Sequence, residues 1–107
     1  MFIINDEKWY VEYVSPIHTY LYRESTGTYT LGCCDDLTKT IYLNENLQGS
    51  LLKKVLCHEI THAAMFSYNI ELTYEQEEIV ADIIATFGEE IVLTTNKIFN
   101  KLKEGYY

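Results

Sequence analysis

The chain contains 107 residues, of which 48% are hydrophobic and 22% are charged; these proportions are typical of one globular domain and exclude a disordered or fibrous chain. Eight Lys and Arg residues against 16 Asp and Glu residues give a formal net charge of −8. We expect no nucleic-acid partner and no membrane partner for so acidic a domain, because both are recognised through clustered basic side chains.

The first part of the chain is predicted to be rich in β-structure. Apolar stretches at 2–4 and 9–14 are separated by polar residues, a pattern typical of a short hairpin or of one bent strand. Residues 15–27 follow no clear pattern and are expected to form an irregular connection. Residues 28–34 and 40–44 predict two strands joined by a turn rich in Asp and Thr. We therefore expect a small, mostly antiparallel sheet.

The second part of the chain is predicted to be helical. Apolar residues recur at helical spacing from just after Ser50, the expected N-cap, to about Phe66. Thr73 and Gln76 have the spacing of a capping box and predict the start of a second helix. Gly88 either ends that helix or only bends it, so the apolar residues beyond it form a separate C-terminal helix or a continuation.

The order of these elements defines the fold class. Strands precede helices along the chain, which is typical of an α+β protein. We expect one domain over residues 1–107, with a β-rich part at 1–48 and a helical part at 49–107. The helical part is expected to contain an active-site helix, a second helix with a metal ligand, and a C-terminal helix.

The cysteines and the start of the chain bear on the cellular compartment. The three cysteines are odd in number and two are adjacent, and the first residues lack the pattern of a signal peptide. No apolar run approaches the roughly 18 residues of a membrane span. We therefore expect free thiols and a cytoplasmic location.

The residues that indicate chemistry are His58-Glu59-Ile60-Thr61-His62, an H-E-x-x-H pattern inside the first predicted helix. Residues four apart share one helix face, so both imidazoles can bind one zinc ion. Glu59 is rotated by about 100° from His58, beside the open position of the metal, where it can act as general base. A solvated helix face is the alternative, but polar side chains in an apolar helix need partners. We therefore expect one Zn²⁺ per chain and Glu59 as a catalytic residue.

A catalytic zinc site needs a third protein ligand. No histidine follows His62, and His18 lies far upstream in the irregular segment, so a carboxylate is expected. Glu78 and Asp82 lie four apart on one face of the second helix. We predict Glu78 as the ligand, with Glu77 as the alternative, and Asp82 as the carboxylate that orients a ligand histidine.

The second helix also carries the residues that point to a family. Glu78-Ile-Val-Ala81-Asp82-Ile-Ile-Ala85 matches the pattern E-x-x-A-[ND]-x-[FIL]-A, which follows the H-E-x-x-H helix in the ImmA/IrrE-type metallopeptidases. The chain resembles the small phage-type members of this gluzincin-like group over roughly residues 28–90. The resemblance implies a minimal zincin-like domain. Because some members cleave repressors and so release a mobile element, it also implies a regulator of a phage or mobile element as substrate.

Candidate substrate-binding residues lie on both sides of the expected metal site. In zincins of this layout, the strand before the active helix pairs its edge with the substrate backbone. The candidates on that strand are Leu31, Gly32, Cys33 and Cys34. Tyr68 and Tyr74, between the two metal helices, are candidates for stabilising the oxyanion. Ordinary roles in the sheet and in packing are the alternatives for all six.

These residues together predict a zinc metallopeptidase that hydrolyses peptide bonds of a polypeptide substrate. The net charge of −8 favours a basic substrate, such as a DNA-binding regulator. A first alternative is a zinc-stabilised protein-binding module without turnover. A second alternative is a latent peptidase whose C-terminal tail, residues 99–107, blocks its own site.

Overall fold

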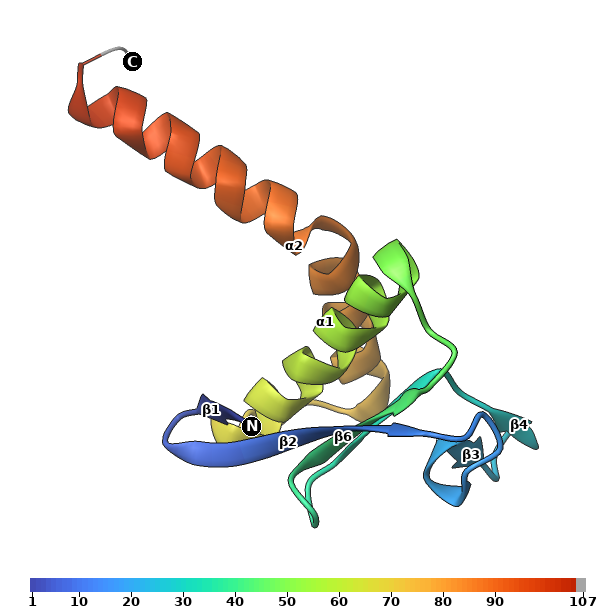
Figure 1. Cartoon of the computed structure of the whole chain (residues 1–107). Helices are drawn as coiled ribbons and strands as arrows, with labels where there is room; N and C mark the ends of the chain where they lie inside the picture. The colour runs from blue at the N-terminus through green and yellow to red at the C-terminus, as the bar shows by residue number, and fades with distance from the viewer. Residues whose placement is uncertain (106–107) are drawn as a thin grey trace.

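Figure 1 shows the computed structural model of the chain, which describes residues 1–105. The main sheet has four strands in the order β1 (Phe2–Ile4), β2 (Glu7–Val14), β6 (Thr40–Asn44) and β5 (Gly32–Asp35). The pairs β1–β2 and β5–β6 are antiparallel, whereas β2 and β6 run parallel. Both expected hairpins are therefore present, and the parallel pair joins them into one sheet that leaves β5 at an edge. With two helices after it, the sheet gives the α+β fold expected from the sequence.

The segment between the two hairpins is more regular than its sequence predicts. It contains η1 (Thr19–Leu21) and a two-stranded sheet of β3 (Tyr22–Arg23) and β4 (Thr28–Tyr29). The single strand predicted over 28–34 is wrong, because the chain leaves β4 at Thr30 before it enters β5. The amide of Thr30 donates to the Leu21 carbonyl (2.7 Å), and the Thr30 hydroxyl donates to the Gly32 carbonyl (3.0 Å). These bonds hold the small sheet beside β5.

The two helices begin with different caps. α1 (Gly49–Ser67) has Gln48 as its N-cap, because the Gln48 carbonyl already accepts a hydrogen bond from the Leu52 amide (3.3 Å). The N-cap predicted at Ser50 is therefore wrong, since Ser50 lies within the first turn. α2 (Tyr74–Lys103) begins at the capping box expected from the sequence, in which Thr73 Oγ1 accepts from the Gln76 amide and Gln76 Oε1 accepts from the Thr73 amide.

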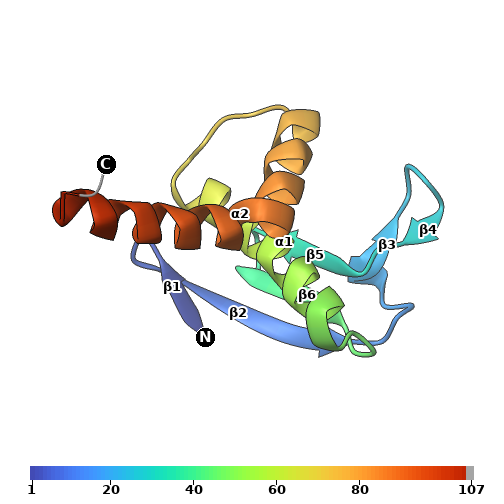
Figure 2. The same cartoon turned by 90° about the horizontal axis from the view of Figure 1, so that it is seen from above.

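Of the two alternatives for the residues beyond Gly88, the continuation is confirmed and the separate C-terminal helix is wrong, because α2 is one helix of 30 residues. Gly88 lies in its interior and does not end it. A glycine inside a helix costs only about 1 kcal/mol relative to alanine. The hydrogen-bonded turns on both sides of Gly88 offset this cost, so the helix continues. Figure 2 shows that α2 changes direction midway, and Figure 1 shows its second half extending away from the sheet.

The core lies between α1 and the sheet. The buried residues at its centre are Trp9, Ile41, Leu43, Leu47 and Ala63. Full burial of each large apolar side chain contributes about 1.5–3 kcal/mol. The Trp9 indole Nε1 donates to Ser67 Oγ (2.7 Å), and Asn5 Nδ2 donates to the Ser67 carbonyl (2.9 Å). The first hairpin is thereby fixed to the C-terminal end of α1, which holds the second half of that helix against the sheet.

The second half of α2 is exposed along its whole length, residues 89–103. Ala81 is the one residue of α2 that is buried, and the apolar side chains after Gly88 are about half exposed. Within residues 1–105, neither helix has the combination of length and hydrophobicity needed to cross a bilayer. The contact between α2 and the rest of the domain is therefore concentrated in its first half, which packs on α1.

Candidate metal centre

Three side chains from α1 and α2 bring one donor atom each to the same point. His62 Nε2 lies 3.1 Å from His58 Nε2 and 2.7 Å from Glu78 Oε1, and His58 Nε2 lies 3.5 Å from the same oxygen. Tetrahedral ligands at 2.0–2.1 Å from a zinc ion would be about 3.3 Å apart. These are the groups whose donor atoms all lie within 4.8 Å of one another. Their spacing therefore fits a single small metal ion.

The folding of the two helices explains why these atoms meet. His58 and His62 are one turn apart on α1, so their imidazoles point the same way. Glu78 lies in the first turns of α2, which packs against that face of α1. Ala81 is completely buried between the helices, and its small side chain allows the close approach that carries the Glu78 carboxylate to both rings.

Each imidazole is oriented by a second carboxylate on its other nitrogen. His58 Nδ1 lies 2.9 Å from Asp82 Oδ1, and His62 Nδ1 lies 2.6 Å from Glu77 Oε1. A proton held on each Nδ1 leaves the lone pair of each Nε2 directed at the shared point, as metal-binding histidines require. Sequence reasoning expected one such carboxylate, Asp82, whereas the structure contains two.

Glu77 is the site residue whose position the sequence did not reveal. Glu77 is the predicted alternative ligand, but its carboxylate contacts Nδ1 of His62, while Glu78 reaches both Nε2 atoms. A second orienting carboxylate could have been expected, because each of two ligand histidines needs an orienting group. Choosing Glu77 as the second one, however, depends on how α2 is rotated against α1.

Glu59 lies beside this cluster without joining it. Its side chain is 6% exposed, and it is packed against Gly32 of β5. Burial raises the pKa of the Glu59 carboxyl above its usual range, although the neighbouring imidazoles of His58 and His62 oppose this shift. A carboxyl group with this environment is suited to accepting and returning a proton.

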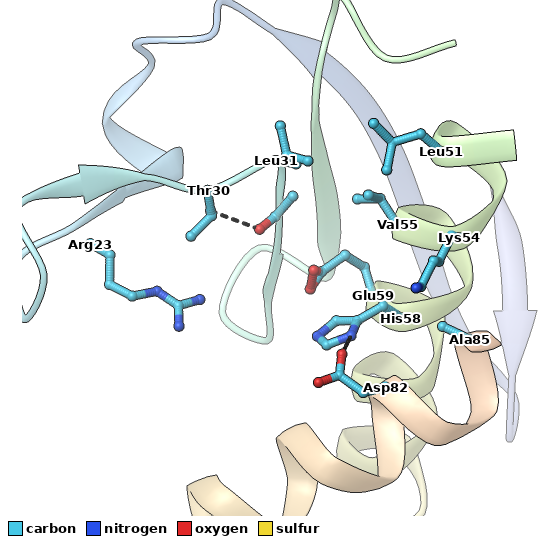
Figure 3. A pocket seen from close by; sticks show the side chains of 11 residues that line it. Arg23, Thr30, Leu31, Leu51, Lys54, Val55, His58, Glu59, Asp82 and Ala85 are labelled. Carbon is cyan, nitrogen blue, oxygen red and sulfur yellow. Dashed lines mark hydrogen bonds and ion pairs between the residues drawn. The ribbon is translucent and has the colours of Figure 1, made fainter. Parts of the chain in front are cut away.

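Two cavities adjoin Glu59, and Arg23 and Gly32 line both of them. The smaller, of about 300 Å³, is shown in Figure 3 and is lined by apolar side chains that include Leu31, Leu51 and Val55. The larger, of about 730 Å³, extends past His62 toward α2. Because β5 is an edge strand and lines both cavities, its free edge lies along them.

The candidate substrate-binding residues are distributed between these two cavities, except for Tyr68. Leu31 and Gly32 line the smaller one, and Gly32, Cys33, Cys34 and Tyr74 line the larger one. Tyr68 lines neither and is 56% exposed. Tyr68 therefore lies away from both cavities, at the C-terminal cap of α1 and beyond the turn that carries His62.

Arg23 was not expected at the site, because its segment was interpreted as irregular. It is the only arginine of the sequence and lines both cavities. Its guanidinium donates a hydrogen bond to the Tyr74 hydroxyl and lies 5.8 Å from the centre of that ring. Figure 3 shows the Arg23 side chain extending toward the cavity opposite Glu59. Arg23 therefore joins Lys54, which lines the smaller cavity, as a cationic group beside Glu59, and no sequence pattern indicated it.

The remaining candidate groups lie apart from the cluster. His18 caps η1, where its Nδ1 accepts from the Tyr20 amide (3.2 Å). The cysteines form no disulfide, as expected. Burial raises the pKa of Cys33 to about 11, and it raises the pKa of Cys34 further. Both thiols therefore stay protonated at neutral pH and are poor metal ligands in that form.

Gly32→Ala is expected to destabilise the domain. A Cβ at this position would lie 2.9 Å from Val55 Cγ1 and 3.1 Å from Glu59 Cγ. Replacing glycine by alanine on unstrained backbone normally stabilises by about 0.4–1 kcal/mol, but overpacking of this kind costs about 1–3 kcal/mol. The free energy of unfolding, measured with urea, should therefore fall. A variant as stable as the wild type would mean that β5 and α1 are less tightly packed than they are here.

The fold and the cluster define a class of protein. An α+β domain with an H-E-x-x-H helix packed against a second, acidic helix is a zinc metallopeptidase-like domain. The chain belongs to the Peptidase_M78 family: residues 14–106 match the model of its IrrE N-terminal-like domain. This family is zinc-dependent in general. No curated protein and no solved structure matches the chain.

Proposed function

We propose that this protein is a zinc-dependent metalloendopeptidase that hydrolyses peptide bonds of a polypeptide, with the ion held by His58, His62 and Glu78. The observation that carries this proposal is the convergence of three donor atoms whose imidazoles are already oriented by Asp82 and Glu77. A site built only for structure would close the fourth position with another protein ligand. Here that ligand is lacking among the described residues, and buried Glu59 adjoins the cluster instead.

The chain's own residues have separate tasks in this reaction. A bound zinc ion supplies Lewis-acid chemistry, which polarises the peptide carbonyl and makes water acidic enough to lose a proton near neutral pH. Glu59 takes that proton on its carboxylate and later gives it to the leaving amine nitrogen. Burial of Glu59 favours the protonated form between the two transfers. Asp82 and Glu77 keep the two imidazoles in the tautomer that presents Nε2.

The substrate is proposed to lie in an extended conformation along the free edge of β5. An edge strand offers unpaired backbone groups to an extended peptide, and the two cavities beside Glu59 have room for substrate side chains. Arg23, held by Tyr74, is placed to donate a hydrogen bond to a substrate carbonyl oxygen. The candidate substrate-binding residues on and beside β5, together with Tyr74, therefore keep their proposed role, and Arg23 is added to them.

The partner is proposed to be a basic polypeptide, with no nucleic acid or membrane involved. The net charge of −8 favours the approach of a positively charged chain. A DNA-binding regulator of a phage or mobile element in the cytoplasm has that character, and the resemblance to the ImmA/IrrE-type metallopeptidases implies such a substrate.

The proposed function is tested by metal removal. Protein purified without added metal is expected to contain one zinc ion per chain and to cleave a basic protein substrate, and a chelator should abolish cleavage until zinc is restored. The ion joins α1 to α2, so its loss should also lower the melting temperature. Metal content, cleavage and melting are measured on the same sample. The matched control is the double variant His58→Ala/His62→Ala, which should bind no zinc, and full occupancy in it would contradict the site.

A further inference from the structure

The second half of α2 carries an apolar surface that the metal site does not use. Its residues, which we call the α2 stripe, are Phe87, Ile91, Val92, Ile98, Phe99 and Leu102. They recur three, four, seven or eleven positions apart and therefore lie on one side of the helix. All are about half exposed, and Figure 1 shows the second half of α2 extending away from the other elements. Several large apolar side chains grouped in this way indicate an interaction surface.

A row of charges runs beside the α2 stripe and shows what kind of partner fits it. Glu90, Lys97 and Lys101 have the same spacing as Ile91, Ile98 and Leu102 and precede them by one residue, so the row follows one flank of the stripe. The row is acidic near the middle of α2 and basic near its end. Glu89, the neighbouring acidic residue outside this row, is paired with Lys53 of α1 (2.6 Å), and Glu90 is the one acidic group of the row.

A second copy of the same helix complements this row in one orientation only. When two copies run antiparallel, Glu90 of each lies near the basic end of the other, and the two helix dipoles also oppose each other favourably. When they run parallel, Glu90 meets Glu90 and the lysines meet lysines. Charges that flank an apolar seam are known to set partner and orientation in this way.

We propose that residues 87–103 of α2 pair with the same residues of a second copy, antiparallel, to form a homodimer. The interface buries the α2 stripe of both copies, and Glu90 of each copy pairs with Lys97 or Lys101 of the other. Neither cavity at the metal centre is lined by a residue beyond Ala85, so both sites stay open in this dimer. The proposal does not depend on catalysis.

The test compares two variants of the full chain that add the same charge to opposite faces of the same helix. Ile91 is 56% exposed and Leu93 is 59% exposed, but their side chains lie about 200° apart around α2. Analytical ultracentrifugation of the wild type is expected to give a mass that rises with concentration from one chain toward two. Ile91→Asp should raise the dissociation constant by about tenfold or more, because it places an unpaired charge in the seam. Leu93→Asp should change it by no more than about twofold.

Charge reversal tests the orientation. Glu90→Lys should weaken the dimer, and Glu90→Lys combined with Lys101→Glu should restore it, since the pairs are then re-formed with opposite sign. Circular dichroism checks that each variant keeps its helices, which is expected because the substituted residues are exposed. A wild type that is monomeric at every concentration overturns the proposal, and so does equal weakening by Ile91→Asp and Leu93→Asp. Failure of the double variant to restore the dimer overturns the antiparallel arrangement.

Discussion

Glu59→Gln is expected to reduce peptide-bond cleavage by at least about 10²–10⁴-fold, the usual contribution of a positioned general base. The amide has nearly the same size and shape, so the packing against Gly32 is kept. It cannot accept the proton of the attacking water, and no other carboxylate takes this place in the described part of the site, since Glu77, Glu78 and Asp82 are engaged with the histidines. Rates on one protein substrate and zinc content are measured together.

Glu75→Gln is the matched control for this experiment. Glu75 lies in the first turn of α2 and lines neither cavity, so the same chemical change there should leave the cleavage rate intact. A peptidase loses turnover in Glu59→Gln and keeps its zinc. A protein-binding module would show no turnover in either form, and that result would favour the non-catalytic alternative.

The second large effect is expected in zinc affinity, which substitutions of neighbouring carboxylates should lower by different amounts. Glu78→Gln removes one of three ligands and should lower zinc affinity the most, because the carboxylate oxygen that faces both Nε2 atoms is lost. Glu77→Gln and Asp82→Asn each remove an oriented partner of an imidazole and should cost about 10–100-fold. Competition with a chromophoric chelator measures all three, with Glu75→Gln as the unaffected control.

The order of these affinities tests the rotation of α2. If Glu77→Gln lowered zinc affinity more than Glu78→Gln, the carboxylate on the metal would be Glu77, and α2 would be rotated by one residue, about 100°, from its position here. Equal affinities for Asp82→Asn and wild type would show that His58 needs no orienting group.

Most of the metal site could be predicted because it depends on local periodicity. His58, Glu59 and His62 are fixed relative to one another by a single helix, and Glu78 and Asp82 by another. The position of Glu77 could not be read in this way. Both glutamates lie near the start of α2, and which of them faces the metal depends on the packing of Ala81 against α1, a contact between distant segments.

The features that the sequence did not predict are held in place by contacts between residues far apart in the chain. β3 and β4 have only two residues each, too few to show a periodic pattern, and they are held by Thr30 and Leu21 across the chain. Arg23 reaches the site only through that small sheet. The tail suggested as an inhibitor could also not be placed from sequence. Its residues 99–105 line neither cavity at the metal centre, and Tyr106 and Tyr107 lie outside the described residues.

The attachment of α2 through the metal centre has a consequence for the lifetime of the protein in a cell. α2 has one buried residue, and its first half brings three carboxylates to a pair of histidines. Without an ion, little apolar burial opposes local unfolding of this helix, and chaperones and proteases act on chains that unfold. We therefore expect newly made chains that fail to acquire metal to be degraded first, so that the cellular amount of the protein follows the supply of zinc.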